Sequence, residues 1–295
     1  MKTVLIVGAG GFVGKNLKEH LEAGGRYHLL CPKKEELDCV DEYSVRYYLE
    51  HHPADIILHA AVYNPRVGTG KQAQRELEYD LRMFYNFEKY AELYGRMFCF
   101  GSGAEYDKRN PMVQVREEDE SRTVPVGDYG FAKYVIGQQI LKSRNIYNLR
   151  IFGLFGKYEN WKTTFISGAC CRAVKGLPIT IRQNVYFDYL YINDFCRLVE
   201  ILMEKQLSAH EYQVVSGKRT DLLTIAGLVL RASGKQLPVY VCRDGLAQEY
   251  TASNERLLQE IGVFEYTPME TAVKELYKWY LEREEGIDLY PLLYP

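Results

Sequence analysis

The sequence lacks a hydrophobic run long enough to cross a membrane. Its apolar N-terminal stretch, MKTVLIVGAG, is too short for a signal peptide or for a membrane-spanning helix, which needs about 20 apolar residues. No other stretch approaches that length. The sequence therefore predicts no membrane partner, and its N-terminal run is typical of a buried first strand.

An excess of charge of either sign is also missing. Lys and Arg number 37 against 39 Asp and Glu, which gives a formal net charge of -2. A chain this close to neutral has no general attraction for nucleic acid or for anionic membranes. We therefore expect no nucleic-acid partner.

Cysteine and histidine patterns typical of metal sites are absent as well. None of the seven cysteines stands in a C-x-x-C pair, and the six histidines show no metal-ligand spacing. Without a secretion signal, such cysteines are typical of reduced thiols in the cytoplasm. The sequence predicts a cytoplasmic protein without a metal site.

What the first half does contain is a regular alternation of strand-like and helix-like segments. Apolar runs at 3–7, 27–31, 55–59, 96–100 and 147–151 alternate with helical patterns at 12–23, 42–50, 75–93 and 129–142. Strands that alternate with helices predict βαβ units, a parallel sheet and helices on both of its faces. The expected fold class is α/β, a Rossmann-type doubly wound parallel sheet.

After Ile151 this rhythm breaks down. Gly, Pro and aromatic residues are mixed with shorter elements, apart from a helical pattern at 194–205 that we expect to return to the core. The 295 residues suffice for a core and a smaller C-terminal lobe. We therefore predict a core of 1–151 plus about 187–205, and a lobe of about 152–186 and 206–295.

A glycine-rich loop, Gly8-Ala9-Gly10-Gly11-Phe12-Val13-Gly14, follows the first strand and opens the first helix. Gly8 permits a tight turn, Gly11 lets the backbone approach a pyrophosphate, and Gly14 allows close packing of helix on strand. The free N–H groups at the helix start attract phosphate. The loop, including Phe12 and Val13, predicts a dinucleotide site; the alternative is a glycine-rich turn without a ligand.

The end of the second strand distinguishes the two nicotinamide dinucleotides. An acid there binds the ribose of NAD, and a base there accepts the extra phosphate of NADP. Lys33 and Lys34 follow the strand, and no acid stands at its tip, which favours NADP(H). NAD(H) stays open, because these lysines also fit a solvated loop and Glu35 or Glu36 could serve the ribose.

Tyr129 and Lys133 form a Tyr-x-x-x-Lys pair at the start of a predicted helix. Residues four apart share a helix face, and an ammonium group beside a phenol favours the phenolate, so the pair can exchange a proton with a substrate. Ser102 follows the strand at 96–100 and is expected beside the same crevice. The spacing also occurs by chance at Tyr85/Lys89 and Tyr158/Lys162, and Ser102 alone fits a turn serine.

The order of these motifs resembles the extended short-chain dehydrogenase/reductase family, the group of NAD-dependent sugar-nucleotide epimerases, dehydratases and reductases. The resemblance rests on the glycine loop, His59-Ala60-Ala61, Ser102 four residues before Tyr106, Tyr129/Lys133, the stretch 187–194 and the stretch 254–258. It implies cofactor contacts at Asp38, His59, Ala60 and Ala61, and catalysis by Ser102, Tyr129 and Lys133. It also implies that the C-terminal lobe binds the nucleotide of a nucleotide-sugar substrate.

Within this family, the segments 36–38 and 80–83 look most similar to the GDP-fucose synthase branch. Ala104 and the threonines Thr163 and Thr164 stand where that branch has the cysteine and histidine of its 3,5-epimerisation, so the resemblance does not extend to this activity. Gly103-Ala104 likewise departs from the Asp-Glu of the 4,6-dehydratases.

One further departure concerns the substrate diphosphate. Phe187 replaces the family arginine that meets this group. Arg172 and Arg182 are candidate substitutes, and a solvated arginine is the alternative for each.

With 3,5-epimerisation and dehydration set aside, the activity of this family that fits the sequence is hydride transfer at one carbon of the sugar. We expect NADPH-dependent reduction of a nucleotide-linked 4-keto-(6-deoxy)hexose, with an NAD-dependent 4-epimerase and a non-catalytic dinucleotide sensor as alternatives.

The helices at 75–93 and 129–142 carry apolar residues on more than one face. This excess predicts a homodimer through these helices, and burial under local loops is the alternative.

Overall fold

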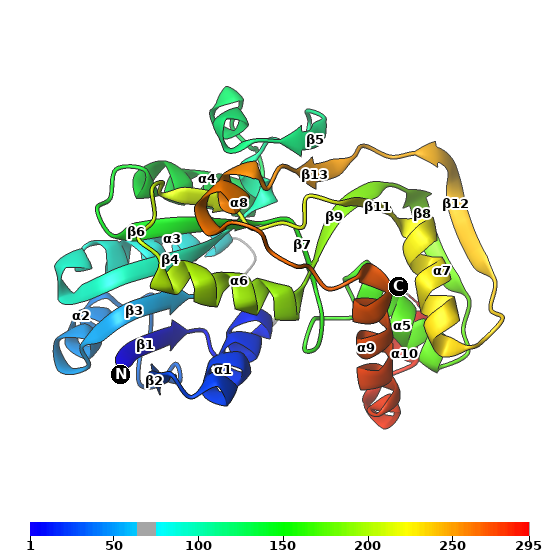
Figure 1. Cartoon of the computed structure of the whole chain (residues 1–295), viewed down its shortest axis with the longest axis horizontal. Helices are drawn as coiled ribbons and strands as arrows, with labels where there is room; N and C mark the ends of the chain where they lie inside the picture. Colours follow the sequence, from blue (N-terminus) through cyan, green and yellow to red (C-terminus); the bar gives the residue numbers. More distant parts are fainter. Residues whose placement is uncertain (64–74, 295) are drawn as a thin grey trace.

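The core of the protein is a six-stranded parallel sheet (Figure 1), in a computed structural model that describes residues 1–63 and 75–294. The strand order is β10-β6-β4-β3-β1-β2. The bounds are β1 Lys2–Val7, β2 Tyr27–Leu30, β3 Ala54–His59, β4 Tyr94–Ser102, β6 Ile146–Ile151 and β10 Glu211–Gln213. The order reverses between β1 and β3, which in doubly wound sheets is where a ligand binds.

Helices cover both faces of this sheet, as the alternation in the sequence predicts. Two separate apolar clusters lie against it, one with α1 and α6 and the other with α2, α3 and α4. The bounds are α1 Phe12–Gly24, α2 Glu42–His51, α3 Glu76–Glu88, α4 Asp128–Ile140 and α6 Ile192–Glu204. The expected α/β fold with a Rossmann-type sheet is therefore confirmed.

The sequence explains the first βα unit in detail. The last four residues of β1 are fully buried, as in a central parallel strand with helices on both sides. The following helix α1 ends at Gly25, whose φ of 62° is the left-handed conformation that closes many helices. The chain then turns directly into β2.

Three details differ from the pattern read in the sequence. Strand β4 continues to Ser102, so this serine ends the strand instead of following it. The helix expected over 75–93 is α3 followed by a separate 3₁₀ helix, η2 (Ala91–Leu93). Finally, β10 comes from the segment that the predicted division gives to the lobe, yet it pairs with β6 as the sixth core strand.

The lobe contains a five-stranded sheet, a two-stranded sheet and a group of helices. The helices lie at the right of Figure 1, and β5 and β13 lie at its top. In the larger sheet β5 (Met112–Val115), from the first half of the chain, pairs with β13 (Tyr250–Ala252). The other lobe strands are β7 Gly153–Phe155, β8 Ile179–Asn184, β9 Tyr186–Tyr191, β11 Arg219–Asp221 and β12 Val239–Leu246. The lobe helices are α5 Phe165–Val174, α7 Leu222–Ser233, α9 Met269–Leu281 and α10 Tyr290–Leu293.

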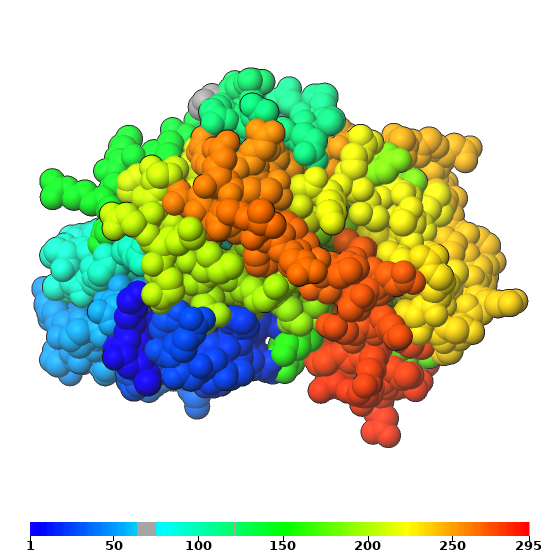
Figure 2. Space-filling model, viewed as in Figure 1, coloured from blue at the N-terminus to red at the C-terminus, as the bar shows by residue number. Residues whose placement is uncertain are grey.

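One segment of the second half returns across the core. Figure 2 shows the orange stretch that contains α8 (Glu255–Ile261) across the middle of this face. Short 3₁₀ helices complete the chain: η3 Gly103–Glu105, η4 Glu117–Arg122 and η5 Glu284–Gly286.

The described residues contain neither a membrane-spanning helix nor a metal-binding group of side chains. Within 1–63 and 75–294, no helix combines the length and apolar character that crossing a membrane requires. The same residues contain no group of three or more His, Cys, Asp or Glu side chains placed to hold a metal ion. All seven cysteines are free thiols.

Candidate active site

A cleft of about 1140 Å³ runs along the carboxyl ends of the core strands. Its volume exceeds the roughly 300–1,000 Å³ of ordinary small-molecule sites, so it has room for an extended ligand. Its lining includes Gly8, Gly11, Phe12, Val13, Lys33, Lys34, Asp38, His59, Ala60, Ala61, Ser102 and Tyr129. Residues predicted from widely separated motifs thus meet in one cavity.

The glycine loop forms one wall of the cleft, and its backbone leaves no room for a side chain at Gly8 or Gly14. Gly8 has a φ of +81°, and a Cβ there would lie 2.7 Å from the backbone nitrogen of Ala61. A Cβ on Gly14 would lie 2.2 Å from the carbonyl oxygen of Gly8. Gly14 therefore supports the turn from behind and is not itself part of the cleft lining.

This loop presents an anion-binding end of a helix to the cleft. Gly11 is the N-cap of α1 and has no side chain to satisfy the helix's first N–H groups. Unsatisfied N–H groups and the helix dipole stabilise a bound phosphate. The cleft and the loop thus fit a dinucleotide with its pyrophosphate at Gly8–Gly14.

The two lysines after β2 line the same cleft. Lys34 Nζ lies 3.8 Å from a carboxylate oxygen of Asp38, and both side chains are exposed to solvent. The Lys33 backbone N–H donates to Glu36, but its ammonium group has no carboxylate partner in the part of the chain that the structure describes. The Lys33 ammonium group is therefore available to a ligand at the end of the cleft next to β2.

At the other end, Ser102 and Tyr129 both line the cleft. They come together because α4 begins directly against the 3₁₀ turn after β4. A Cβ on Gly130 would lie 2.6 Å from the carbonyl oxygen of Ala104, so only a glycine allows this approach. The Ser102 hydroxyl caps the turn by accepting from the Ala104 N–H at 3.1 Å.

Lys133 lies one turn below Tyr129 on α4 and is buried. Its Nζ donates to the carbonyl oxygen of Phe100 at 3.0 Å and is 5.8 Å from the centre of the Tyr129 ring. The lysine therefore places its ammonium group behind the tyrosine, buried and held by the Phe100 carbonyl, outside the lining of the cleft itself.

His59 and Asp80 lie beside this lysine. Burial and the nearby Lys133 charge lower the pKa of His59 to about 4, so the imidazole is neutral near pH 7. Burial raises the pKa of Asp80, although the charge of Lys133 opposes this. Asp80 accepts a hydrogen bond from the Tyr63 N–H at 2.7 Å, which fixes one rim of the cleft.

The two arginines suggested for the substrate diphosphate lie elsewhere. Arg172 donates to the carbonyl oxygens of Pro178 and Leu292, and Arg182 is exposed on β8. Neither lines the large cleft. Phe187 packs its ring against Tyr189 and Tyr250.

Sequence reasoning missed several residues of this site. Tyr79 and Met83 line the cleft together, and their four-residue spacing on α3 was the available signal. Phe152 lines the cleft as well, and Tyr250 packs beside it with ring centres 5.0 Å apart. No pattern distinguished Tyr250 among the 25 tyrosines of the chain.

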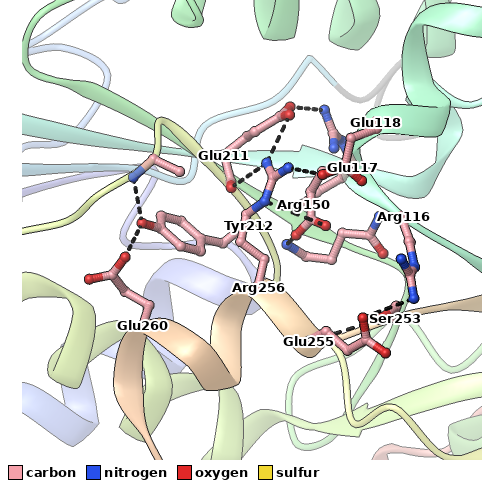
Figure 3. Close-up of polar contacts among 12 residues, drawn as sticks. Arg116, Glu117, Glu118, Arg150, Glu211, Tyr212, Ser253, Glu255, Arg256 and Glu260 are labelled. Atoms are coloured by element: carbon pink, nitrogen blue, oxygen red, sulfur yellow. Dashed lines mark hydrogen bonds and ion pairs between the residues drawn. The ribbon is translucent and has the colours of Figure 1, made fainter.

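A buried ionic network supports the Ser102 turn from behind. Glu105 accepts from the Ser102 N–H at 2.8 Å and from the fully buried Arg150 at 2.6 Å. Arg150 also pairs with Glu211 at 2.9 Å. In Figure 3, Arg256 from α8 reaches the same Glu211, so the network extends from the turn to the segment that crosses the core.

Comparison with known proteins decides the family. The model of the NAD dependent epimerase/dehydratase family matches residues 4–215, which include the glycine loop, Ser102, Tyr129 and Lys133. The chain belongs to this family. It is accordingly an NAD(P)-dependent enzyme, and the resemblance to extended short-chain dehydrogenases/reductases is confirmed.

A curated relative matches only a short segment of this family member. GDP-L-colitose synthase of Yersinia pseudotuberculosis is 40% identical over 58 residues, which are 20% of this chain and 18% of that protein. The match therefore spans less than a fifth of the relative's length.

Solved structures match nearly the whole chain. A GDP-L-fucose synthetase of Naegleria fowleri bound to NADP has a TM-score of 0.84 at 16% identity, covering 96% of this chain and 94% of that one. RMD of Pseudomonas aeruginosa complexed with NADPH has a TM-score of 0.80 at 20% identity, and the match covers 96% of this chain and 100% of that one. A GDP-6-OMe-4-keto-L-xylo-heptose reductase of C. jejuni has a TM-score of 0.79 at 16% identity, and the match covers 96% of this chain and 98% of that one. At these identities the likeness shows the fold.

Proposed function

We propose that this chain reduces a nucleotide-linked 4-keto-(6-deoxy)hexose at C4, with NADPH as hydride source and Tyr129 as proton donor. The observation that carries the proposal is the meeting of the Ser102 and Tyr129 side chains in the glycine-lined cleft, with Lys133 buried beneath them. These groups are a hydroxyl donor, a proton donor and a fixed cation, which together suit reduction of a carbonyl.

Each residue has a separate task in this proposal. The bound nicotinamide supplies the hydride that reaches the C4 carbon. Tyr129 donates its hydroxyl proton to the C4 oxygen as negative charge develops there, and the Ser102 hydroxyl donates a hydrogen bond to the same oxygen. Lys133, held by the Phe100 carbonyl, stabilises the phenolate that Tyr129 becomes and binds the nicotinamide ribose.

The choice of NADPH rests on the two lysines after β2. Lys33 and Lys34 line the cleft, and Lys33 is without an ion-pair partner among residues 1–63 and 75–294. A positive group at this position suits the additional phosphate of NADP(H). The names of two structural relatives, which mention NADP and NADPH, agree with this choice.

The test follows absorbance at 340 nm while the purified protein is mixed with NADPH or NADH and a panel of nucleotide-linked 4-keto-6-deoxyhexoses. The proposal expects oxidation with one panel member and a preference for NADPH. Oxidation of neither cofactor with any member would contradict it. Interconversion of C4 epimers by protein that retains NAD would instead establish the 4-epimerase.

We also propose a cytoplasmic homodimer that forms through α3 and α4. Tyr85 on α3 and Phe131 on α4 are apolar side chains with 36% exposure, and Leu141, directly after α4, has 45% exposure. Light scattering should give twice the mass of one chain at micromolar concentration, and a single-chain mass would overturn the dimer.

A further inference from the structure

A third hydroxyl group reaches the catalytic turn from the C-terminal lobe. Tyr250 lies on β13, which pairs with β5 at Met112 and with β9 at Phe187. Its ring packs against Phe152 and Phe187, with ring centres 5.0 and 5.7 Å apart. Strand pairing on both sides and aromatic packing therefore fix the direction of this side chain.

The end of this side chain rests on the turn that carries Ser102. An ideal Cβ on Gly103 would lie 2.3 Å from the Tyr250 hydroxyl oxygen, so the phenol occupies the space that the glycine leaves. Burial raises the pKa of Tyr250, the nearby Tyr129 raises it further, and an interaction with the Ser102 side chain lowers it. The Tyr250 hydroxyl is consequently protonated at neutral pH and available as a donor.

The hydrogen-bonding capacity of Ser102 shows what this donor can do. A serine hydroxyl has one proton and two acceptor positions. The Ala104 N–H occupies one acceptor position of the Ser102 oxygen at 3.1 Å. If the second acceptor position were empty, the Ser102 proton would be free to rotate among several directions.

We propose that Tyr250 is a positioning residue that donates its hydroxyl proton to the second acceptor position of the Ser102 oxygen. With both acceptor positions filled, the single Ser102 proton points toward the cleft and is presented to the substrate carbonyl oxygen. The inference rests on the proposed ketone reduction. It makes the lobe part of the reaction centre, because β13 completes a site whose other hydroxyls belong to the core.

The first test is Tyr250→Phe, which keeps the ring and removes the hydroxyl. We expect kcat to fall about tenfold, as for one lost hydrogen bond, with KM for NADPH unchanged. In a Ser102→Ala background the same change should have no further effect on kcat, because there is no longer a serine proton to orient. Independent, multiplicative losses in this double-mutant cycle would overturn the inference.

The matched control is Tyr94→Phe. This tyrosine is also buried, but it begins β4, at the opposite end of the strand from Ser102. Its hydroxyl donates to the carbonyl oxygen of Phe87. The control should lower the melting temperature without changing kcat, which separates loss of a buried hydroxyl from loss of the contact with Ser102.

A second variant approaches the same contact from the other side. Gly103→Ala places a methyl group against the Tyr250 hydroxyl and should push it away from Ser102. It should lower kcat, and Tyr250→Phe should add nothing in its background. If the wild-type enzyme reduces a 4-keto sugar and the Tyr250→Phe variant does so with the same kcat, the inference is wrong and the proposed function stands. If the wild-type enzyme reduces none of the 4-keto sugars, the proposed function is wrong and the inference falls with it.

Discussion

In the proposed function, single residues at the two ends of the cleft have different tasks, cofactor binding at one end and chemistry at the other. At one end, the backbone of Gly8–Gly14 and the Lys33 ammonium are the groups that we propose for the phosphates of the cofactor. At the other, Tyr129 lies above the buried ammonium of Lys133 and beside Ser102. This separation predicts that a change at either end alters one property and leaves the other.

The first prediction concerns the proton donor. Tyr129→Phe should lower kcat by about 10²–10⁴, because a positioned proton donor contributes about that factor. Binding of NADPH, measured by fluorescence titration, should be unchanged. Tyr158→Phe is the matched control, because Tyr158 shares the spacing to a lysine but donates its hydroxyl to Glu19 at 2.7 Å. Near-normal turnover of Tyr129→Phe would remove the tyrosine from its assigned role.

The second prediction concerns the glycine loop. In Gly14→Ala the new methyl group would lie 2.2 Å from the Gly8 oxygen, so the turn must shift. We expect the free energy of unfolding to fall by about 1–3 kcal/mol and NADPH binding to weaken. Gly10→Ala is the control for stability, since a Cβ there meets nothing within 4 Å. Equal stability of the two variants in urea titrations would contradict the packing described for this loop.

At the scale of elements, a network of ion pairs joins the turn that carries Ser102 to β6, β10, α8 and η4. The buried Arg150 on β6 joins Glu105 of the Ser102 turn to Glu211 on β10. Arg256 joins Glu211 to Glu118, which links α8 to the 3₁₀ helix η4 (Figure 3). The turn that carries Ser102 is therefore supported by charged contacts among elements that are far apart in the sequence.

This network gives the third prediction. Arg150→Met should lower the free energy of unfolding by about 3–5 kcal/mol, because it leaves the Glu105 carboxylate buried without its cation. Adding Glu105→Gln should recover part of that loss. The control is Arg116→Met, whose pair with Glu255 is more than 60% exposed on both side chains and is worth at most about 1 kcal/mol. Similar losses for the two arginines in chemical denaturation would argue against the network's importance.

The sequence predicts the core elements better than the connections between them. Hydrophobic runs and the glycine loop suffice for β1, α1 and the parallel sheet, because local patterns determine these. Strand β10 and the contact of Tyr250 with the Ser102 turn depend on pairing between segments more than 60 residues apart. Such pairings leave no local periodicity, so neither was predicted.

At the scale of the whole molecule, the free energy of unfolding depends on pH through the buried carboxyl group of Glu159. Burial raises the pKa of Glu159 from 4.5 to about 7, so the folded chain favours the protonated carboxyl. This preference contributes fully to the free energy of unfolding below pH 4.5, where the carboxyl is protonated in both the folded and the unfolded chain. The contribution is lost as the pH rises through 7, where the folded chain must also ionise the buried group. Glu159→Gln should therefore leave stability unchanged at pH 4.5 and raise it by about 1–3 kcal/mol at pH 8. Unfolding curves with an equal difference at both pH values would refute this.

Core and lobe together form the reaction centre in this account. The core supplies the cofactor surface, Ser102, Tyr129 and Lys133, and the lobe supplies Tyr250. In the reaction that we propose, hydride from a nicotinamide is delivered to a sugar C4 in this cleft, with net reduction of the substrate.

The most direct measurement uses NADPH that carries deuterium at the transferable position of its nicotinamide. After reaction with the 4-keto sugar that the panel identifies, mass spectrometry and NMR would locate the label in the product. We expect one deuterium at C4 for each NADPH oxidised. Product without the label, or product formed without net oxidation of NADPH, would contradict it.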